Sequence, residues 1–281
     1  MLDGGFEQAS KSQAIELNEG IYAGSHWSNY PISIIDNYKP YDVLFSWSHY
    51  FSKLLEADFK SSDAYEVGYI ATDYFKFHRK ESSELKDQYK EKFIITFNDN
   101  VFYKDIAISE VHYDAFYSLI VDILNLYENV VIFIKPKRVG LFKEKKKSFK
   151  ELNKYITNGR ARVFLADNER SKITPGQVAI ASDLVIGLGI STTTLESVIA
   201  GTPAINFGLC QFNNNNFYQE SLNKVVFNDT RSIKKEIHRL INSNPKESLN
   251  EHREFYRILD PFLDQSAGTR IGKKLMELLN S

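Results

Sequence analysis

The stretch A-S-D-L-V-I-G-L-G-I-S-T-T-T-L-E-S-V-I-A-G-T-P-A-I-N-F, from Ala181 to Phe207, decides the fold class of this chain. Asp183–Ile186 contains a short run of apolar residues that is typical of a strand buried in a parallel sheet. Gly187 and Gly189 follow, and we expect them to end the strand, because glycine lets the backbone turn where a Cβ atom would clash.

A helix is expected after this turn. Four hydroxyl residues, Ser191–Thr194, can cap its start, and apolar residues then recur at helical spacing. Gly201 is the expected C-cap, and Pro203 opens a second apolar run that extends to Phe207. The whole stretch therefore predicts a strand–turn–helix–strand crossover of the βαβ type.

The start of that helix is a candidate anion site. A helix N-terminus presents backbone N–H groups and about half a positive charge, which suits a phosphate. The simpler interpretation is that Ser191 or Thr193 only caps the helix, with Glu196 completing a capping box with Thr193. Taken alone, the stretch favours the capping interpretation, and other segments shift the balance.

Composition narrows the class of protein. The 281 residues are enough for one large domain or two modest ones, and 43% hydrophobic residues argue against disorder. A formal net charge of -1 provides no basic field for nucleic acid. The single cysteine, Cys210, excludes a disulfide framework and a cysteine-based zinc site. Without a secretory signal pattern or an apolar run of about 20 residues, a cytoplasmic protein is expected, and peripheral membrane attachment stays open.

Strand and helix patterns alternate from Phe93 to about Ile241. The expected strands there are Phe93–Phe97, Val130–Ile134, Val163–Ala166, the two in the opening stretch, and Val225–Phe227. The expected helices begin after Ser109, at Thr174-Pro175 and at Ser232, whereas the basic run Leu141–Lys150 reads as a solvated loop. This alternation predicts an α/β fold with a doubly wound, mostly parallel, Rossmann-like sheet over residues 91–281.

Residues 1–90 predict only the last strands of a second α/β domain, followed by a linker. The elements expected there are a loop over Gly20–Tyr30, a strand over Tyr41–Trp47, a helix over His49–Leu55, a strand over Ala64–Ile70 and a linker or exposed helix over Asp73–Lys90. At the other end, Leu259–Leu279 predicts a terminal helix that is broken near Asp264–Gly268.

Three predicted strand ends carry groups that suit a ligand, because ligands of open α/β sheets bind outside the carboxyl ends of the strands. They are Asn98-Asp99-Asn100, Lys135-Pro-Lys-Arg138 and Gly187–Thr194. A lysine there is a reasonable diphosphate clamp, and a carboxylate one turn into the helix, at Glu196, can accept two ribose hydroxyls. The sequence contains no G-x-G-x-x-G after an early strand, no P-loop, no H-E-x-x-H and no Cys/His cluster, so it gives no support to an NAD, P-loop or metal site.

Ser182–Phe207 resembles the donor-binding signature of GT-B fold glycosyltransferases, in particular those that build bacterial surface polysaccharides of the capsule, lipopolysaccharide or teichoic type. That signature has a strand ending in glycine, hydroxyl residues at a helix start, a glutamate one turn later, and G-x-P before the next strand. Lys135-Pro136 resembles the family's basic strand end, often K-x-H-P, although no histidine stands here. Leu259–Ile271 resembles the family's C-terminal end, so the resemblance covers about Phe93 to Leu279.

The resemblance implies transfer of a sugar or polyol phosphate from a nucleotide-activated donor to a carbohydrate or lipid-linked glycan. The residues that would hold the donor phosphates are Gly189, Ser191, Thr192, Thr193 and Lys135. Glu196 would bind the ribose or the donor sugar, and the helix start with the lysine would neutralise the leaving phosphate, so neither a metal nor a cofactor is expected. The candidates for the general base are Asp99, His26 and, more weakly, His49.

A complete enzyme of this kind has a full first Rossmann domain for its acceptor, which roughly ninety residues before Phe93 cannot supply. We therefore expect a fragment, a chain completed by a partner subunit, or a much reduced acceptor site. Two alternatives to a transferase remain, namely a sugar-nucleotide epimerase of GT-B-like fold and a non-catalytic nucleotide-binding module.

Overall fold

The computed structural model describes residues 15–25, 41–55, 63–72, 74–100, 108–146, 150–165, 173–208 and 216–280. Contacts divide the chain into two compact units, one formed by Met1–Asp73 with Tyr256–Ser281 and the other by Tyr74–Phe255. This division differs from the boundary expected after residue 90. The charged segment before that boundary forms helix α3, Phe75–Asp87, which packs against helix α7, Pro175–Ile180, of the second unit. The residues after Tyr256 join the first unit instead of extending the second.

The second unit is built on a six-stranded sheet in which every neighbouring pair is parallel, in the order β6-β5-β4-β7-β8-β9. Its strands are β4 Phe93–Asn98, β5 Val130–Lys135, β6 Ala161–Val163, β7 Leu184–Leu188, β8 Ala204–Phe207 and β9 Val226–Phe227. The chain runs outward from β4 to β6 and then returns to start again at β7. The strand order therefore reverses between β4 and β7, which is the arrangement of the doubly wound fold.

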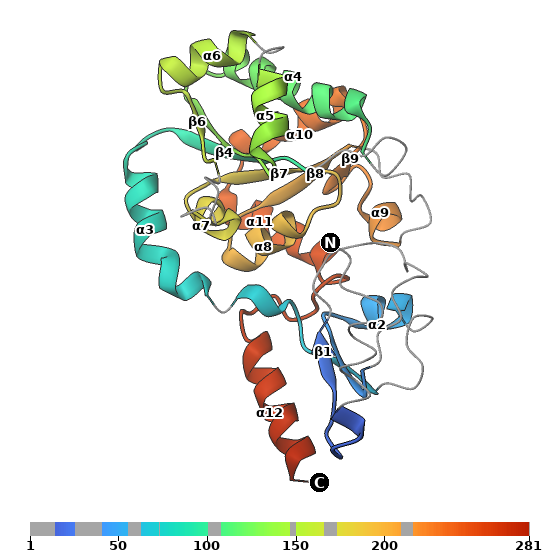
Figure 1. Cartoon of the computed structure of the whole chain (residues 1–281). Helices are drawn as coiled ribbons and strands as arrows, with labels where there is room; N and C mark the ends of the chain where they lie inside the picture. Colours follow the sequence, from blue (N-terminus) through green and yellow to red (C-terminus); the bar gives the residue numbers. More distant parts are fainter. Residues whose placement is uncertain are drawn as a thin grey trace. The chain divides into compact units, whose positions relative to one another are not determined.

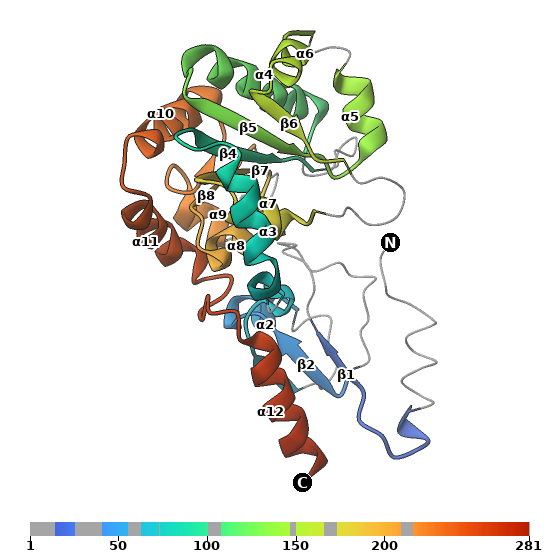
Figure 2. The same cartoon turned by 90° about the vertical axis from the view of Figure 1, so that its left-hand side faces the viewer.

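Helices cover both faces of this sheet (Figures 1 and 2). Those on one face are α4 Glu110–Leu126, α5 Val139–Lys146, α6 Lys150–Thr157 and α10 Thr230–Ile241. Those on the other are α3, α7 and α8 Thr192–Ala200, and the remaining helices of the unit are α9 Asn216–Ser221 and α11 Pro245–Tyr256. The expected doubly wound parallel α/β fold is confirmed.

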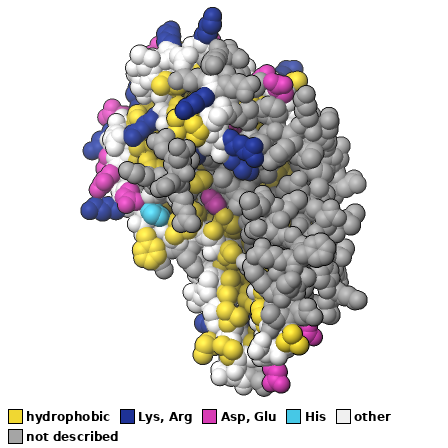
Figure 3. Space-filling model, viewed as in Figure 1, with side chains coloured by type: hydrophobic (Ala, Val, Ile, Leu, Met, Phe, Trp, Pro, Cys, Tyr) yellow, Lys and Arg dark blue, Asp and Glu magenta, His cyan; other side chains and the backbone are white. Residues whose placement is uncertain are grey.

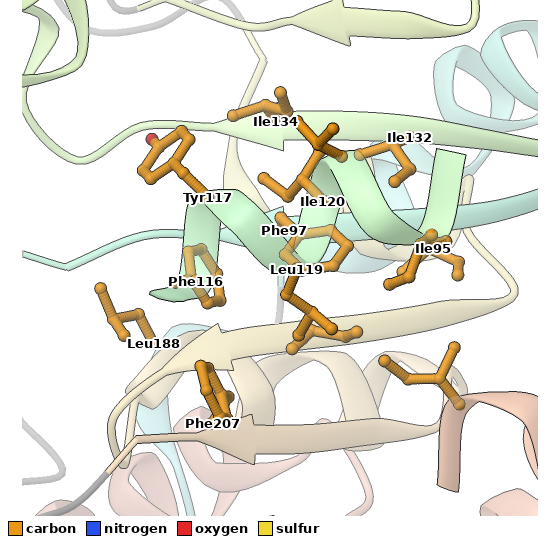
Figure 4. Packing of buried hydrophobic residues seen from close by; sticks show 14 of the residues in the cluster. Ile95, Phe97, Phe116, Tyr117, Leu119, Ile120, Ile132, Ile134, Leu188 and Phe207 are labelled. Carbon is orange, nitrogen blue, oxygen red and sulfur yellow. The ribbon is translucent and has the colours of Figure 1, made fainter. Parts of the chain in front are cut away.

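The largest core lies between α4 and the sheet (Figure 4). Phe116 of α4 contacts Phe97 of β4 edge to face at 5.1 Å and lies nearly parallel to Phe207 of β8 at 6.4 Å. All three rings are at most 2% exposed. Burial of each aromatic side chain contributes about 1.5–3 kcal/mol to the stability of the fold. This packing holds one side of β4 against α4, so alternate residues of the strand point away from α4.

The opposite face of β4 is partly polar. Ile94 packs with Val178 of α7, and the Thr96 hydroxyl lies 2.6 Å from the Ser182 hydroxyl, which donates to the Val178 carbonyl at 2.7 Å. The residue that follows on this face by strand alternation is Asn98, at the end of β4. The predicted start of α7 is confirmed, because Thr174 and Gln177 form a capping box ahead of Pro175.

Several local expectations need correction. Gly187 lies inside β7 and does not end it, since strand pairing continues to Leu188. Residues 139–146 form helix α5, so the lysines of the basic run are partly helical. The sequence also missed β1, Ala23–Ser25, a three-residue strand that depends on its partner, and it missed α11 altogether.

The first unit contains a three-stranded parallel sheet in the order β1-β2-β3. Its other elements are β2 Val43–Ser46, α2 His49–Leu55, β3 Asp63–Glu66, the short 3-10 helix η2 Ile70–Thr72 and α12 Ala267–Leu279. Apolar residues of β2 and the β3 end pack against α12, namely Val43, Phe45 and Val67 with Ile271, Leu275 and Leu278. Asp260 holds the segment before α12 to the residues that follow β3. Its carboxylate accepts the backbone N–H groups of Tyr69, Phe262 and Leu263 at 2.9 to 3.1 Å.

The described surface carries mixed charge. Lysine and arginine side chains are interspersed with aspartate and glutamate over the part of the second unit that Figure 3 displays. This pattern agrees with the formal net charge of -1. Within the described ranges, no helix has the length and apolar character needed to span a bilayer.

Candidate functional site

Helix α8 begins at the carboxyl end of β7, and its start is held by hydroxyl groups. Ser191 is the N-cap, and its side chain accepts the Thr193 N–H at 3.3 Å while lying 2.9 Å from the Thr193 hydroxyl. The Thr194 hydroxyl donates to the Ser191 carbonyl at 2.7 Å. Because the N-cap is Ser191, the expected box between Thr193 and Glu196 does not form, since a box joins the cap to the third helical residue. Gly201 ends the helix at φ 102°, as expected.

Four residues form a row across the sheet at this edge. Asn98 of β4 pairs with Lys135 of β5 on one side and with Gly187 of β7 on the other. Gly187 in turn pairs with Asn206 of β8. All four therefore stand at one level of the sheet, on the face that carries α7 and α8. We call Lys135, Asn98, Gly187 and Asn206 the polar row.

Two glycines let α8 begin close to the sheet. A Cβ atom at Gly187 would lie 2.6 Å from the Thr194 methyl group, so a larger residue would push the helix away. Gly189 has φ 70°, which favours glycine, and a Cβ there would lie 2.9 Å from the Ile108 Cδ1 atom. Glycine is thus required at this turn for two separate reasons. Gly187 allows the helix to approach the strand closely, and Gly189 adopts a backbone conformation that favours glycine.

Asn206 connects the row to the helix start. Its Oδ1 atom accepts the Ser191 N–H at 3.3 Å and the Thr194 hydroxyl at 2.9 Å. Its Nδ2 group donates to the Val225 carbonyl at 3.3 Å. The start of α8 is therefore fixed by β8 as well as by its own cap.

Glu196 lies in the first turns of α8 and is 8% exposed. Burial, followed by the nearby charge of Glu196, raises the pKa of Tyr74 at the start of α3. The Tyr74 side chain also interacts with Thr174 at the cap of α7. The carboxylate expected to bind ribose thus lies among the starts of three helices on one face of the sheet.

Lys135 is 7% exposed, and its ammonium group donates to the Phe164 carbonyl at 3.3 Å. Burial lowers the pKa of Lys135, while the charge of Asp99 acts in the opposite direction. Neighbouring strands lie about 4.8 Å apart, so two strand spacings place the Lys135 backbone roughly 10 Å from Gly187. Lys135 and the start of α8 are thus separate groups at the same edge of the sheet.

Asp99 is buried among three donors. Its Oδ2 atom accepts the hydroxyls of Tyr113 at 2.8 Å and Tyr117 at 2.7 Å, and its Oδ1 atom accepts the Lys137 N–H. Burial raises the pKa of Asp99, although these hydrogen bonds oppose the shift. Both oxygens are therefore engaged by protein groups, and the carboxylate holds the chain that follows Lys135.

The two histidine candidates are placed differently. His26 lies outside the described residues. His49 belongs to the first unit, where its Nδ1 atom lies 3.2 Å from Glu66 and its side chain is 68% exposed. Among the residues that the structure describes, no three His, Cys, Asp or Glu side chains gather as a metal site would need.

Sequence reasoning placed Asn98 at a polar strand end but missed Asn206 and the tyrosines around Asp99. Tyr113 and Tyr117 stand four residues apart on α4, which follows the β4 strand end, so their spacing was a readable signal. No such signal exists for Asn206, or for the alignment of Asn98 with the rest of the polar row, because both depend on strand register.

Comparison of the sequence with protein-family models and with curated proteins finds no match. Solved structures do match the fold. The chain is similar to a putative UDP-N-acetylglucosamine 2-epimerase from Listeria monocytogenes, with a TM-score of 0.65 and 14% identity over 92% of this chain and 68% of that one. The strand order, the crossovers and this similarity agree. The second unit has the doubly wound Rossmann-like fold of GT-B structures.

Two other GT-B structures are similar to the chain. Anabaena HepE, solved in complex with UDP and glucose, gives a TM-score of 0.54 and 11% identity over 96% of this chain and 75% of that one. A variant of the wall teichoic acid polymerase TagF, soaked with CDPG, gives 0.53 and 16% over 86% of this chain and 59% of that one. The chain thus spans less than two thirds of the polymerase structure.

Proposed function

We propose that the second unit binds a nucleotide-activated donor and that the protein transfers its sugar or polyol phosphate to a glycan acceptor of the cell surface. The observation that carries the proposal is the start of α8 at the point of strand-order reversal, where Ser191, Thr192 and Thr193 lie beside the polar row. A helix N-terminus at this place favours the oxygens of a phosphate.

The presence of two groups that favour anions at one edge of the sheet supports a nucleotide diphosphate. Lys135 stands two strands away from Gly187, so the lysine and the helix start are two separate groups that favour anions. A donor with two phosphates can offer one to the start of α8 and the other to the Lys135 side chain. Glu196 would then accept hydroxyls of the ribose or the donor sugar, as the resemblance implies.

The chemistry of the proposed transfer balances without a covalent intermediate on the protein. An acceptor hydroxyl oxygen attacks the atom of the transferred group that is bonded to the nucleotide phosphate. This atom is a carbon of the sugar or the phosphorus of the polyol phosphate. The bond from that atom to the nucleotide phosphate breaks, and its electron pair stays on the phosphate oxygen. Lys135 and the helix start stabilise this charge, and the acceptor proton passes to a base. We place Asp99 as a positioning residue for the Lys135–Lys137 segment and leave the base unassigned.

Calorimetric titration of the whole chain with UDP, CDP, GDP and CMP tests the proposal. We expect at least one nucleotide to bind, and Lys135→Met to weaken it about tenfold or more while keeping the buried stem of the side chain. Ser191→Gly should also weaken binding, since glycine replaces an N-cap at a cost of only a few tenths of a kcal/mol.

Asp229→Gly is the matched control for the cap. Asp229 caps α10, where its side chain accepts the Ser232 N–H at 2.8 Å. It should change stability as Ser191→Gly does and leave nucleotide affinity intact. Equal effects of the two glycine variants on affinity would instead assign Ser191 to capping alone, and failure of all nucleotides to bind would reject the proposal.

An epimerase is the second candidate, because the putative 2-epimerase has the highest TM-score of the three structures named above. Turnover of UDP-N-acetylglucosamine without an acceptor would favour it. Nucleotide binding with neither transfer nor turnover would favour a non-catalytic module.

A further inference from the structure

The two asparagines of the polar row differ in a way that points to a ligand. Asn206 uses both ends of its amide, because Oδ1 accepts two hydrogen bonds and Nδ2 donates one. Asn98 is equally buried, at 2% exposure, yet neither its Oδ1 nor its Nδ2 atom has a hydrogen-bond partner. Within the described ranges it is the one side chain with two buried polar atoms that both lack a partner.

A buried amide without partners is costly, since each unpaired polar group loses its hydration without replacement. Burial of an apolar residue of similar size at the end of β4 would avoid that cost. The amide is therefore unexplained by folding, and unpaired buried groups in native proteins are found where an ion, a water or a ligand completes them.

The position of Asn98 strengthens this interpretation. It lies on β4 next to Gly187 of β7, which is the pair of strands between which the sheet order reverses. Figure 4 shows Phe97, the preceding residue, in the core beside α4. Strand alternation places Asn98 on the opposite face, which carries α7 and α8. Its partner on the other side is Lys135. The unpaired amide thus stands in the middle of the proposed donor site.

The chemistry of an amide selects one part of the donor. Phosphate oxygens accept hydrogen bonds only, so a phosphate at Asn98 would satisfy Nδ2 and set negative charge against Oδ1. A hydroxyl group both donates and accepts, and two neighbouring hydroxyls satisfy both ends of the amide. Lys135 and the start of α8, by contrast, favour anions.

We propose that Asn98 binds hydroxyl groups of the transferred moiety and so makes the site selective for a polyhydroxylated sugar or polyol attached to the nucleotide. This inference rests on the proposed function and assigns the phosphates to Lys135 and the helix start. Asn98 is then a specificity-determining residue of the donor site, and the nucleotide portion is bound without it.

Calorimetry with matched ligands tests this assignment. For the nucleotide that binds the whole wild-type chain, affinity is compared between the bare diphosphate and its activated form, with UDP against UDP-glucose and UDP-N-acetylglucosamine, and CDP against CDP-glycerol. Asn98→Leu should weaken the preferred activated donor about tenfold and change the affinity for the bare diphosphate less than twofold. Because leucine removes the unpaired amide, the same variant should raise the melting temperature of the ligand-free protein. Asn98→Ser serves in the same test if the leucine variant does not fold.

The outcomes separate the two proposals. Binding of a bare diphosphate by wild-type protein, with equal effects of Asn98→Leu on both ligand forms, would reject the role of Asn98 and leave the proposed function standing. A lower melting temperature with an unchanged preference would show a structural amide completed by water, which also rejects the role. If wild-type protein binds no nucleotide, the proposed function fails and the selectivity assigned to Asn98 fails with it.

Discussion

The Oδ1 atom of Asn206 accepts a hydrogen bond from the Thr194 hydroxyl at 2.9 Å, so the end of β8 holds the first turn of α8. The same oxygen accepts the Ser191 N–H at 3.3 Å. A side chain on one strand thereby fixes the helix start that follows the neighbouring strand. The position of the proposed phosphate site depends on tertiary packing as well as on the local cap.

Replacement of this anchor should affect stability and binding together. We expect Asn206→Leu to lower the free energy of unfolding by about 2 kcal/mol, because it leaves buried donors unpaired, and to weaken nucleotide binding. Denaturant unfolding and calorimetry measure the two effects. Asn158→Ala is the control, since exposed Asn158 makes a single local bond to the Arg160 N–H and should cost less than about 0.5 kcal/mol. Unchanged nucleotide affinity in Asn206→Leu would separate the anchor from the site.

Asp99→Asn distinguishes a positioning role from a catalytic one. The amide presents an NH₂ group to at least one of the three donors now bound by the carboxylate, so we expect lower stability and weaker nucleotide binding. Tyr117→Phe removes one donor and should give the smaller effect, about 1 kcal/mol in the free energy of unfolding. A variant with wild-type affinity and stability but greatly reduced turnover would instead identify Asp99 as a general base.

His252 should make the stability of the second unit depend on pH. Its Nδ1 atom accepts the Ala204 N–H at 3.1 Å, and burial, followed by the charge of Arg239, lowers its pKa to about 4. The unfolded chain, with a histidine pKa of about 6.5, binds a proton that the folded chain does not, so stability falls as pH decreases from about 6.5 to 4. The loss attributable to this residue is at most about 3 kcal/mol. Urea unfolding across this range should show a flatter pH dependence for His252→Asn, and an identical slope would contradict the assignment.

Asp260 should contribute more to the stability of the first unit than Asp264 does. Asp260 is 3% exposed and accepts three backbone N–H groups, whereas Asp264 pairs with Arg270 at 2.8 Å with its side chain 44% exposed. We expect Asp260→Ala to cost about 2–3 kcal/mol and Asp264→Ala less than about 1 kcal/mol. Limited proteolysis that releases α12, followed by mass spectrometry, gives a local measurement. Equal release rates in the two variants would refute the difference.

Much of the second unit was predictable, because its signals are local. The apolar runs of β4, β5, β7 and β8 predicted buried parallel strands, and hydroxyl residues and glycine predicted both ends of α8. Helix α5 was not expected, since its lysines suggested a loop. Strand β1 was not expected either, since three residues form a strand only with a partner.

The candidate site was predictable in its parts and not in its assembly. Ser191, Lys135 and Glu196 were read from the sequence as single groups at strand ends or one turn into a helix. The alignment of Asn98 with Gly187 and Lys135 requires the register of three strands, two of which are far apart in the chain. The contacts of Asp99 were likewise not predictable, because only the folded chain brings two tyrosines of α4 to its carboxylate.

The discontinuity of the first unit has a consequence for how the chain is made. Strands β1 to β3 share a core with α12, so that core stays open while residues 74–255 are synthesised. The parallel sheet of the second unit, by contrast, is encoded without interruption and can close as soon as it leaves the ribosome. A shortened gene that stops before Tyr256 would therefore remove α12 from the core of the first unit and leave the core of the second unit complete.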